Sequence, residues 1–200
     1  GFVVTFLKPG HCAPDNLTLV LETDSRIGKE AFRIEDGTPG VIRIAGGDER
    51  GLLYGSGKFL RTCRYEEAGL EPGLWRGHSA PEKPVRGMYF ATHFHNWYHE
   101  APVKEVARYV EDLALWGYNS LMVWFDMHHY KGIDDPAAKE MMERLHAILK
   151  AANDVGLGAA LAFIANEAYD GSPESLRADW TSGHDGYTQD LYHYHVELCP

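Results

Sequence analysis

From about residue 85 onward, short apolar segments alternate with longer segments of helical periodicity, and this alternation limits the possible folds more than any other feature. The segments that predict strands are Val85–Thr92, Ser120–Asp126 and Leu157–Ala165. One predicted helix opens at Pro102 and is stopped by Gly117, and a second runs from Pro136 to about Val155. Strands that alternate with helices form a parallel sheet covered by helices. A further strand is expected over His193–Cys199.

The first part of the chain follows a different pattern, with short strands, tight turns and one helix. The predicted strands are Leu17–Glu22, Ala31–Glu35 and Val41–Ala45. A helix is predicted from Glu49 to Arg64, with Asp48 as its N-cap. Glycine is a poor helix former, so we expect close packing on a sheet to explain the glycines inside this helix, which are Gly51, Gly55 and Gly57.

The segment Glu66–Pro84 is rich in glycine, proline and charge, and it is predicted to be an inter-domain linker. We therefore expect a small accessory α+β domain over residues 1–80, ending in this linker, and an α/β domain over residues 81–200. A closed barrel of eight strand–helix units needs about 250 residues. The residues after the linker suffice for four strands, so we expect the first half of a (β/α)8 TIM barrel and a fragment of a longer protein. The alternative is a short doubly wound domain.

Charge and composition argue against several classes of partner. The 19 Lys and Arg residues face 29 Asp and Glu residues, giving a net charge of −10. Such a chain repels phosphate backbones, so nucleic acid is not an expected partner. No apolar run reaches the roughly 18 residues of a membrane span. The N-terminus has no signal-peptide pattern, which leaves the localisation open. The cysteines, three in number and widely spaced, predict reduced structural thiols.

Polar and aromatic side chains gather where the predicted strands end. They are His93, His95 and Trp97 after the first strand, Trp124, Asp126 and His128 at the second, Asn166 and Glu167 at the third, and Glu197 in the fourth. Parallel α/β folds bind ligands at the C-terminal ends of their strands. Aromatic faces with polar edges suit sugar rings, which carry C–H patches surrounded by hydroxyls. We therefore expect a carbohydrate partner.

The histidines allow a different interpretation, a metal site. His93 and His95 can point the same way from a strand, and Asp126 with His128 or His129 can complete a set of ligands. The two-histidine-plus-glutamate helix motif of zinc enzymes is not present, and hydrogen bonding to sugar hydroxyls accounts for the same residues. We therefore expect no metal and no cofactor, and a His-dependent metalloenzyme stays as an alternative.

The order of motifs resembles that of β-N-acetylhexosaminidases and α-glucuronidases. In the first domain the matching motifs are Val41–Ile44, Asp48–Gly55 and Lys58–Leu60, which resemble the accessory α/β domain before the barrel. In the second domain they are Val85–Met88, Trp116–Asn119 and Val123–Asp126, which resemble the first barrel strand, the end of the first helix and the second strand of the hexosaminidases. The resemblance extends over residues 30–167.

This resemblance implies a glycoside hydrolase that acts on an oligosaccharide or polysaccharide. Arg86 corresponds to an arginine that binds hydroxyls of the glycone, and Trp124 and Asp126 to residues that line the sugar pocket. Asn166 and Glu167 fall at ligand-facing positions of the third strand. The first strand lacks the Asp and Arg-His of hexosaminidases, which leaves the sugar open.

The catalytic residues are not assigned by the resemblance. The family's adjacent Asp-Glu pair belongs to the fourth strand, and no Asp-Glu occurs after Gly51, so we expect the catalytic carboxylates to lie beyond residue 200. Glycoside hydrolysis needs an acid and a second carboxyl group or equivalent. The alternative function is a non-catalytic carbohydrate-binding protein on a barrel scaffold.

Overall fold

The computed structural model describes residues 5–8, 11, 16–67, 69–92, 95–163 and 167–176. The chain forms two compact units, one of residues 1–86 with 112–119, the other of residues 87–111 with 120–200. The first unit therefore includes the end of a helix that the sequence assigns to the second domain. The functional assignment of the two units, as an accessory domain and part of a barrel, stays a prediction.

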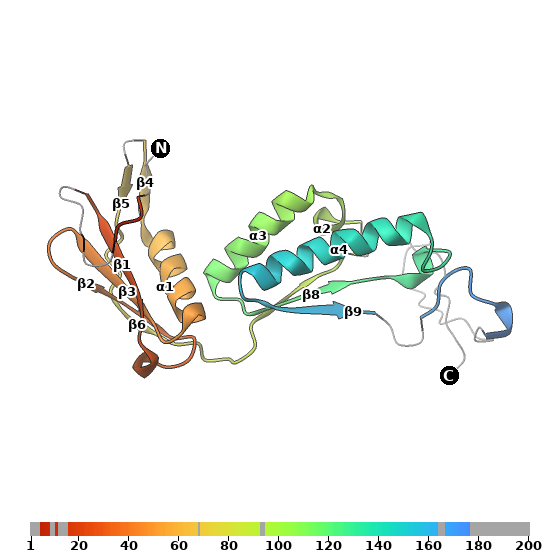
Figure 1. The fold of residues 1–200 in the computed structure, drawn as a ribbon, viewed down its shortest axis with the longest axis horizontal. Helices are drawn as coiled ribbons and strands as arrows, with labels where there is room; N and C mark the ends of the chain where they lie inside the picture. The colour runs from red at the N-terminus through yellow and green to blue at the C-terminus, as the bar shows by residue number, and fades with distance from the viewer. Residues whose placement is uncertain are drawn as a thin grey trace. The chain divides into compact units, whose positions relative to one another are not determined.

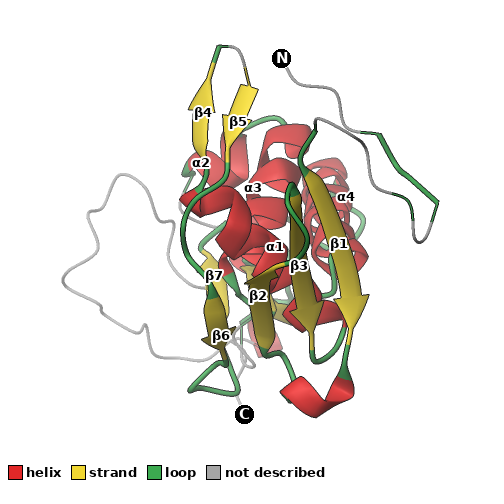
Figure 2. Ribbon diagram, turned by 90° about the vertical axis from the view of Figure 1, so that its left-hand side faces the viewer, coloured by secondary structure: helices red, strands yellow, loops and turns green. Residues whose placement is uncertain are grey.

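The first unit is built on a four-stranded sheet, whose strands lie side by side in Figure 2. In spatial order these strands are β1 (Thr18–Thr23), β3 (Val41–Gly46), β2 (Phe32–Asp36) and β6 (Gly77–Ser79). β1 and β3 are parallel, whereas β2 is antiparallel to both β3 and β6. The strands predicted in this region agree with β1, β2 and β3 to within one residue at each end. A short 3-10 turn, η1 (Ser25–Ile27), follows β1.

Helix α1 (Glu49–Thr62) packs on this sheet, and Figure 1 shows it beside β2 and β3. The Asp48 side chain accepts a hydrogen bond from Gly51 N at 2.7 Å, which confirms the predicted N-cap. Between helix and sheet lies a hydrophobic core formed by Phe32, Ile34, Ile42, Ile44, Tyr54 and Phe59. Burial of these side chains is the main force that holds the unit together.

The glycines of α1 lie where the helix backbone closely approaches neighbouring parts of the chain. A Cβ added at Gly51 would lie 2.2 Å from Ala31 O, and one at Gly55 would lie 2.8 Å from Ile44 Cγ2. Close packing against the sheet region is therefore confirmed at these two positions. At Gly57 the neighbour is different, because a Cβ there would lie 1.9 Å from Leu115 O, near the end of α3 (Val103–Trp116).

Most of the segment predicted as a linker belongs to the first unit instead. β4 (Arg64–Glu66) and β5 (Gly69–Glu71) form an antiparallel hairpin, and β6 adds an edge strand to the sheet. The Trp75 ring lies 5.9 Å from that of Phe32, and Arg76 Nε donates to Asp36 Oδ1 at 2.7 Å. Strands of three residues carry too little periodicity to be recognised among glycines and prolines.

The second unit contains three parallel strands, which confirms the parallel pairing expected of them. They are β7 (Gly87–Phe90), β8 (Ser120–Trp124) and β9 (Gly158–Ala162), with β8 in the middle. Gly87 pairs with Ser120, and Ser120 with Gly158. The fourth predicted strand lies outside the described residues, and the TIM barrel stays a prediction.

Two long helices accompany these strands, and Figure 1 shows them on the same side of β8 and β9. They are α3 and α4 (Pro136–Asp154), of which α4 is capped by the Asp135 side chain, accepting from Ala137 N at 2.9 Å. The shorter elements are α2 (Trp97–Glu100), η2 (Met127–His129) and η3 (Glu174–Leu176). None of the helices within the described ranges is long and apolar enough to cross a membrane.

Candidate functional site

The C-terminal edge of the β7–β8–β9 sheet is where the described polar and aromatic side chains of the second unit converge. Thr92, fully buried just after β7, joins this strand end to β8: its Oγ1 donates to Trp124 O at 2.5 Å and accepts from Trp124 N at 3.1 Å. The Tyr89 ring packs edge-on against Trp124, with 6.2 Å between centroids. Trp124 is thereby fixed at the end of β8, half-buried beside a partly exposed tyrosine.

Beyond β8, three buried side chains form one polar cluster. His128 Nδ1 lies 3.1 Å from Asp126 Oδ1 and also contacts Glu167 Oε1, while His128 N lies 3.3 Å from the same Glu167 oxygen. Trp124 Nε1 lies 3.4 Å from Asp126 Oδ1. None of the three side chains is more than 6% exposed. The cluster joins the loop after β8 to Glu167, in the segment after β9.

The electrostatics of this cluster favour a charged imidazole. Burial alone would raise the pKa of Asp126, but its hydrogen bonds with His128 and Glu167 hold this pKa well below its ordinary value. Burial disfavours charge on His128, yet its hydrogen bonds with both carboxyl groups raise its pKa to about 9. Burial raises the pKa of Glu167; the hydrogen bond with His128 opposes this rise, and that with Asp126 adds to it. A protonated His128 therefore lies between two carboxyl groups of different acidity.

The loops that carry the cluster are also joined through their backbones. Asp170 N donates to Tyr130 O at 2.9 Å, and Gly171 N donates to Lys131 O at 3.1 Å. Lys131 and Asp170 also form an ion pair. These bonds hold the segment after Glu167 against the segment after His128.

The residues after β7 form a second group at this end of the sheet. The Asn96 side chain caps α2, accepting from Tyr98 N at 3.1 Å and donating to Ala91 O at 2.8 Å. His95 and His99 stack with 4.5 Å between ring centroids, and His95 lies 6.1 Å from the ring of His129. Trp97 is 44% exposed and packs edge-on against Tyr98 and Tyr109.

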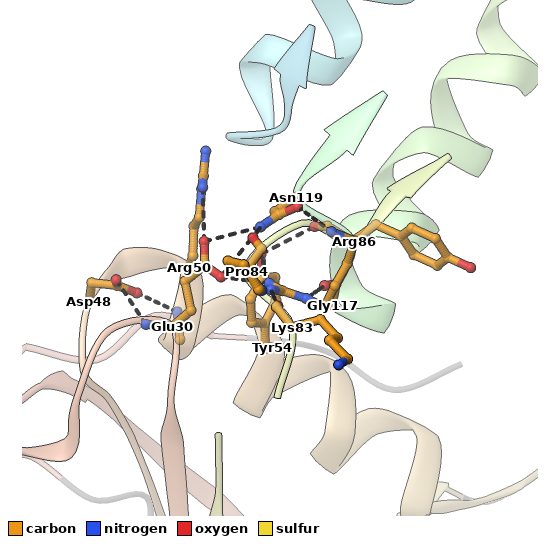
Figure 3. Close-up of polar contacts among 11 residues, drawn as sticks. Glu30, Asp48, Arg50, Tyr54, Lys83, Pro84, Arg86, Gly117 and Asn119 are labelled. Carbon is orange, nitrogen blue, oxygen red and sulfur yellow. Dashed lines mark hydrogen bonds and ion pairs between the residues drawn. The ribbon is translucent and has the colours of Figure 1, made fainter. Parts of the chain in front are cut away.

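Arg86 precedes β7 in the chain, whereas the clustered residues follow the strands. Its guanidinium is engaged within the first unit, as Figure 3 shows. Nε donates to Gly117 O at 2.7 Å and Nη1 to Lys83 O at 2.7 Å, while Nη2 pairs with Glu30 Oε2 at 2.6 Å. The sugar-binding role expected of Arg86 stays a prediction.

Of the other residues predicted for the site, Trp124, Asp126, His128 and Glu167 lie together, and His95 and Trp97 belong to the group after β7. His93, Asn166 and Glu197 lie outside the described residues. Sequence reasoning missed Thr92, whose signal was a threonine at the end of the predicted strand Val85–Thr92. It also missed Glu30, because nothing in the local sequence indicates that its partner is 56 residues away.

Comparison of the fold with solved structures finds several β-N-acetylhexosaminidase-type enzymes. An exo β-N-acetylglucosaminidase of Vibrio harveyi, in complex with N-acetylglucosamine, matches 91% of this chain with a TM-score of 0.65 and 14% identity. The β-N-acetylhexosaminidase of Streptomyces coelicolor A3(2) matches 86% with a TM-score of 0.57 and 18% identity. That of Bacteroides fragilis matches 74% with a TM-score of 0.56 and 14% identity.

The chain spans 33% to 39% of the length of these solved structures. At such identities the likeness concerns the fold alone: the chain has a mixed α/β fold that resembles part of these glycoside hydrolases of family 20. No protein-family model matches the chain, and no curated protein matches its sequence. The resemblance to α-glucuronidases stays a prediction.

Proposed function

We propose that this chain is part of a glycoside hydrolase, with a sugar-binding face at the C-terminal edge of the β7–β8–β9 sheet. The observation that carries the proposal is the convergence of Trp124, Asp126, His128 and Glu167 at this edge, on a fold shared with hexosaminidases. Parallel α/β folds bind ligands at this end of their strands. An aromatic ring beside carboxyl groups is suited to a sugar ring, whose C–H face packs on the aromatic and whose hydroxyls take the hydrogen bonds.

We further propose that the three strands belong to a larger (β/α)8 barrel. β9 is composed of glycine, alanine and leucine, yet its first four residues are exposed. Leu161 is 50% exposed and Phe163 is 56% exposed. Strands of parallel sheets are normally covered on both faces, so an apolar, uncovered edge strand indicates that further strands pack here.

Within this proposal the described residues have distinct roles. Trp124 and Tyr89 supply the apolar surface for the sugar ring, because both rings lie at the strand ends and remain partly exposed. Asp126 and Glu167 both bind His128, so they serve to position groups and bind hydroxyls rather than to protonate the leaving oxygen. The catalytic acid is then supplied by another strand of the barrel.

The engagement of both carboxyl groups with His128 also supports a second candidate function, carbohydrate binding without hydrolysis. The two candidates differ in one measurable property, which is turnover. A panel of chromogenic aryl glycosides, N-acetylhexosaminides included, should be cleaved by the full-length protein if it is a hydrolase. Binding of the corresponding free sugars without cleavage of any aryl glycoside would favour the second candidate.

The binding face is tested with two matched tryptophan variants of the full-length protein. Trp124→Ala should weaken sugar binding by about 1–3 kcal/mol, because it removes the aromatic surface. Trp116→Ala is the control, since Trp116 is 66% exposed and stacks under Arg61 in the first unit. Equal effects of the two substitutions on the sugar dissociation constant, measured by calorimetry, would contradict the proposed face.

A further inference from the structure

We propose that His95, His99 and Glu100 form a binding site for a divalent transition-metal ion of the zinc class. His95 lies just before α2, in the segment that follows β7, and His99 and Glu100 are the last two residues of α2. It goes beyond the proposed sugar-binding face and does not depend on it. Two imidazoles and one carboxylate are a ligand set suited to zinc with an open fourth position.

The distances among the three donors fit one ion. His95 Nδ1 lies 3.5 Å from Glu100 Oε1, and one ligand atom from each of the three residues lies within 4.8 Å of the others. Metal–ligand bonds of about 2.0–2.2 Å place neighbouring donors of a tetrahedral site about 3.4 Å apart. The pair His95–Glu100 already has this separation.

His99 has the hydrogen bonding typical of a metal ligand. Its ring makes a hydrogen bond with the backbone of Thr92, and its Nδ1 is buried without a hydrogen-bond partner among the residues that the structure describes. Metal-bound histidines commonly donate their other ring N–H to a backbone carbonyl, which fixes the ring and its tautomer.

The backbone at His95 supports the same conclusion. His95 has a φ of 47°, in the left-handed region that few residues other than glycine adopt. Asn96, held by Ala91 O and Tyr98 N, fixes this turn, so that His95 stacks on His99 one helical turn later. Strained backbone conformations occur preferentially at functional sites, where the surrounding structure maintains them.

A neighbouring group is a less suitable site. Asp126, His128 and His129 also place one ligand atom each within 4.8 Å of the others. Asp126 and His128, however, already bind each other, and His128 binds Glu167, so an ion would have to replace these buried contacts. At the proposed site the side chains of His95 and Glu100 are 51% and 64% exposed, which gives an ion direct access.

This proposal departs from the sequence-based expectation of no metal. The metal site weighed there combined His93 and His95 with Asp126 and His128 or His129. The signal in the sequence was the spacing of His95 and His99, four residues apart, with a glutamate next to the second. His95 precedes α2, and its left-handed turn, rather than a regular helix, brings its ring against that of His99.

The test is zinc binding by the full-length protein after removal of bound metal with a chelator. Titration with Zn²⁺ against a competing chromogenic chelator should give a site that His95→Gln and His99→Gln each weaken at least about tenfold, since even outer-shell substitutions cost that much. His146→Gln, at an exposed histidine of α4, removes an imidazole elsewhere and should leave the affinity unchanged. The same titration is made with Asp126→Asn.

Each outcome decides the proposal. Loss of affinity in the His95 and His99 variants, with His146→Gln and Asp126→Asn unaffected, supports it. Absence of zinc binding, or affinity lost only in Asp126→Asn, overturns it. If His99→Gln does not fold, His95→Gln still decides, because His95 is exposed and its replacement leaves the core intact. Sugar binding is measured separately, so failure here does not bear on the proposed face.

Discussion

Glu30 and Arg86 form a buried ion pair, with 2.6 Å between Glu30 Oε2 and Arg86 Nη2. The other carboxylate oxygen accepts from Arg50 Nη1 at 2.9 Å, so one buried acid holds two arginines (Figure 3). Arg86 and Asn119 also exchange hydrogen bonds: Arg86 N donates to Asn119 Oδ1, and Asn119 N to Arg86 O. β7 and β8 begin at the residues immediately after these two. The network therefore holds Arg86 and Asn119 together within the first unit.

Glu30→Gln should lower the free energy of unfolding by about 3 kcal/mol, because it leaves two guanidinium groups without their counter-ion. Removal of one partner from a buried ion pair costs about 3–5 kcal/mol, and the partial exposure of both arginines favours the lower end. Glu35→Gln is the control, since the side chains of the Glu35–Arg33 pair are 45% and 44% exposed, and a change below about 0.5 kcal/mol is expected there. Similar urea midpoints for the two variants would contradict a buried role for Glu30.

Arg86→Lys distinguishes two roles of Arg86. The resemblance predicts sugar binding, whereas the contacts support a structural role. Lysine keeps the charge but loses the planar fork that reaches Gly117 O, Lys83 O and Glu30 together. We expect a loss of stability of about 1.5–3 kcal/mol, the range for hydrogen bonds to a charged group. Sugar affinity of the folded fraction should stay unchanged. A lowered affinity with an unchanged melting temperature would instead establish sugar binding by Arg86.

Gly57→Ala should destabilise the protein, although helix propensity alone predicts a gain of about 1 kcal/mol for this change. A Cβ at Gly57 would lie 1.9 Å from Leu115 O, so α1 must move away from the end of α3. Overpacking of this kind costs about 1–3 kcal/mol. The control is Gly132→Ala, where no heavy atom lies within 4 Å of the added Cβ and a change within about 0.5 kcal/mol is expected. Thermal melting shows whether Gly57→Ala raises or lowers the stability. A raised melting temperature would refute the close contact between Gly57 and Leu115.

The sequence predicts the long elements well because their signals are local. Asp48 and Asp135 are N-caps, whose side chains accept hydrogen bonds from backbone N–H groups in the first turn of the helix. The helices that follow them have clear apolar periodicity. By contrast, β4, β5 and β6 have three residues each and depend on their pairing partners, which no local pattern reveals.

The same distinction applies to the candidate site. The strand-end rule was enough to expect Asp126, His128 and Glu167 near one another, because parallel strands end at one edge. It does not give their pairing, in which one imidazole contacts both carboxyl groups. The partner of Arg86 could not be predicted either, because Glu30 lies 56 residues away in the sequence, in a turn where it has a φ of 56°.

The ionisation of His128 makes a prediction about stability against pH. Its pKa is about 9 in the folded chain against an ordinary value of 6.5. A base with a raised pKa contributes stability that is fully present below the ordinary value and is lost as the pH rises through the folded one. Glu167, whose pKa is also raised, acts in the same direction. Asp126, whose pKa is lowered, loses its contribution only on acidification and stays ionised throughout this window.

We therefore expect the free energy of unfolding to fall by up to about 3 kcal/mol between about pH 6 and about pH 9, as the shift of His128 implies. Urea unfolding at several pH values measures this slope in the wild type, His128→Gln and His146→Gln. The slope should persist in His146→Gln, whose histidine is exposed, and should flatten in His128→Gln, which has no imidazole to titrate. Because His128→Gln leaves two buried carboxyl groups near each other, it should also be less stable than the wild type at about pH 6. A wild-type stability that stays level over this range would show that His128 is not held in its charged form by Asp126 and Glu167.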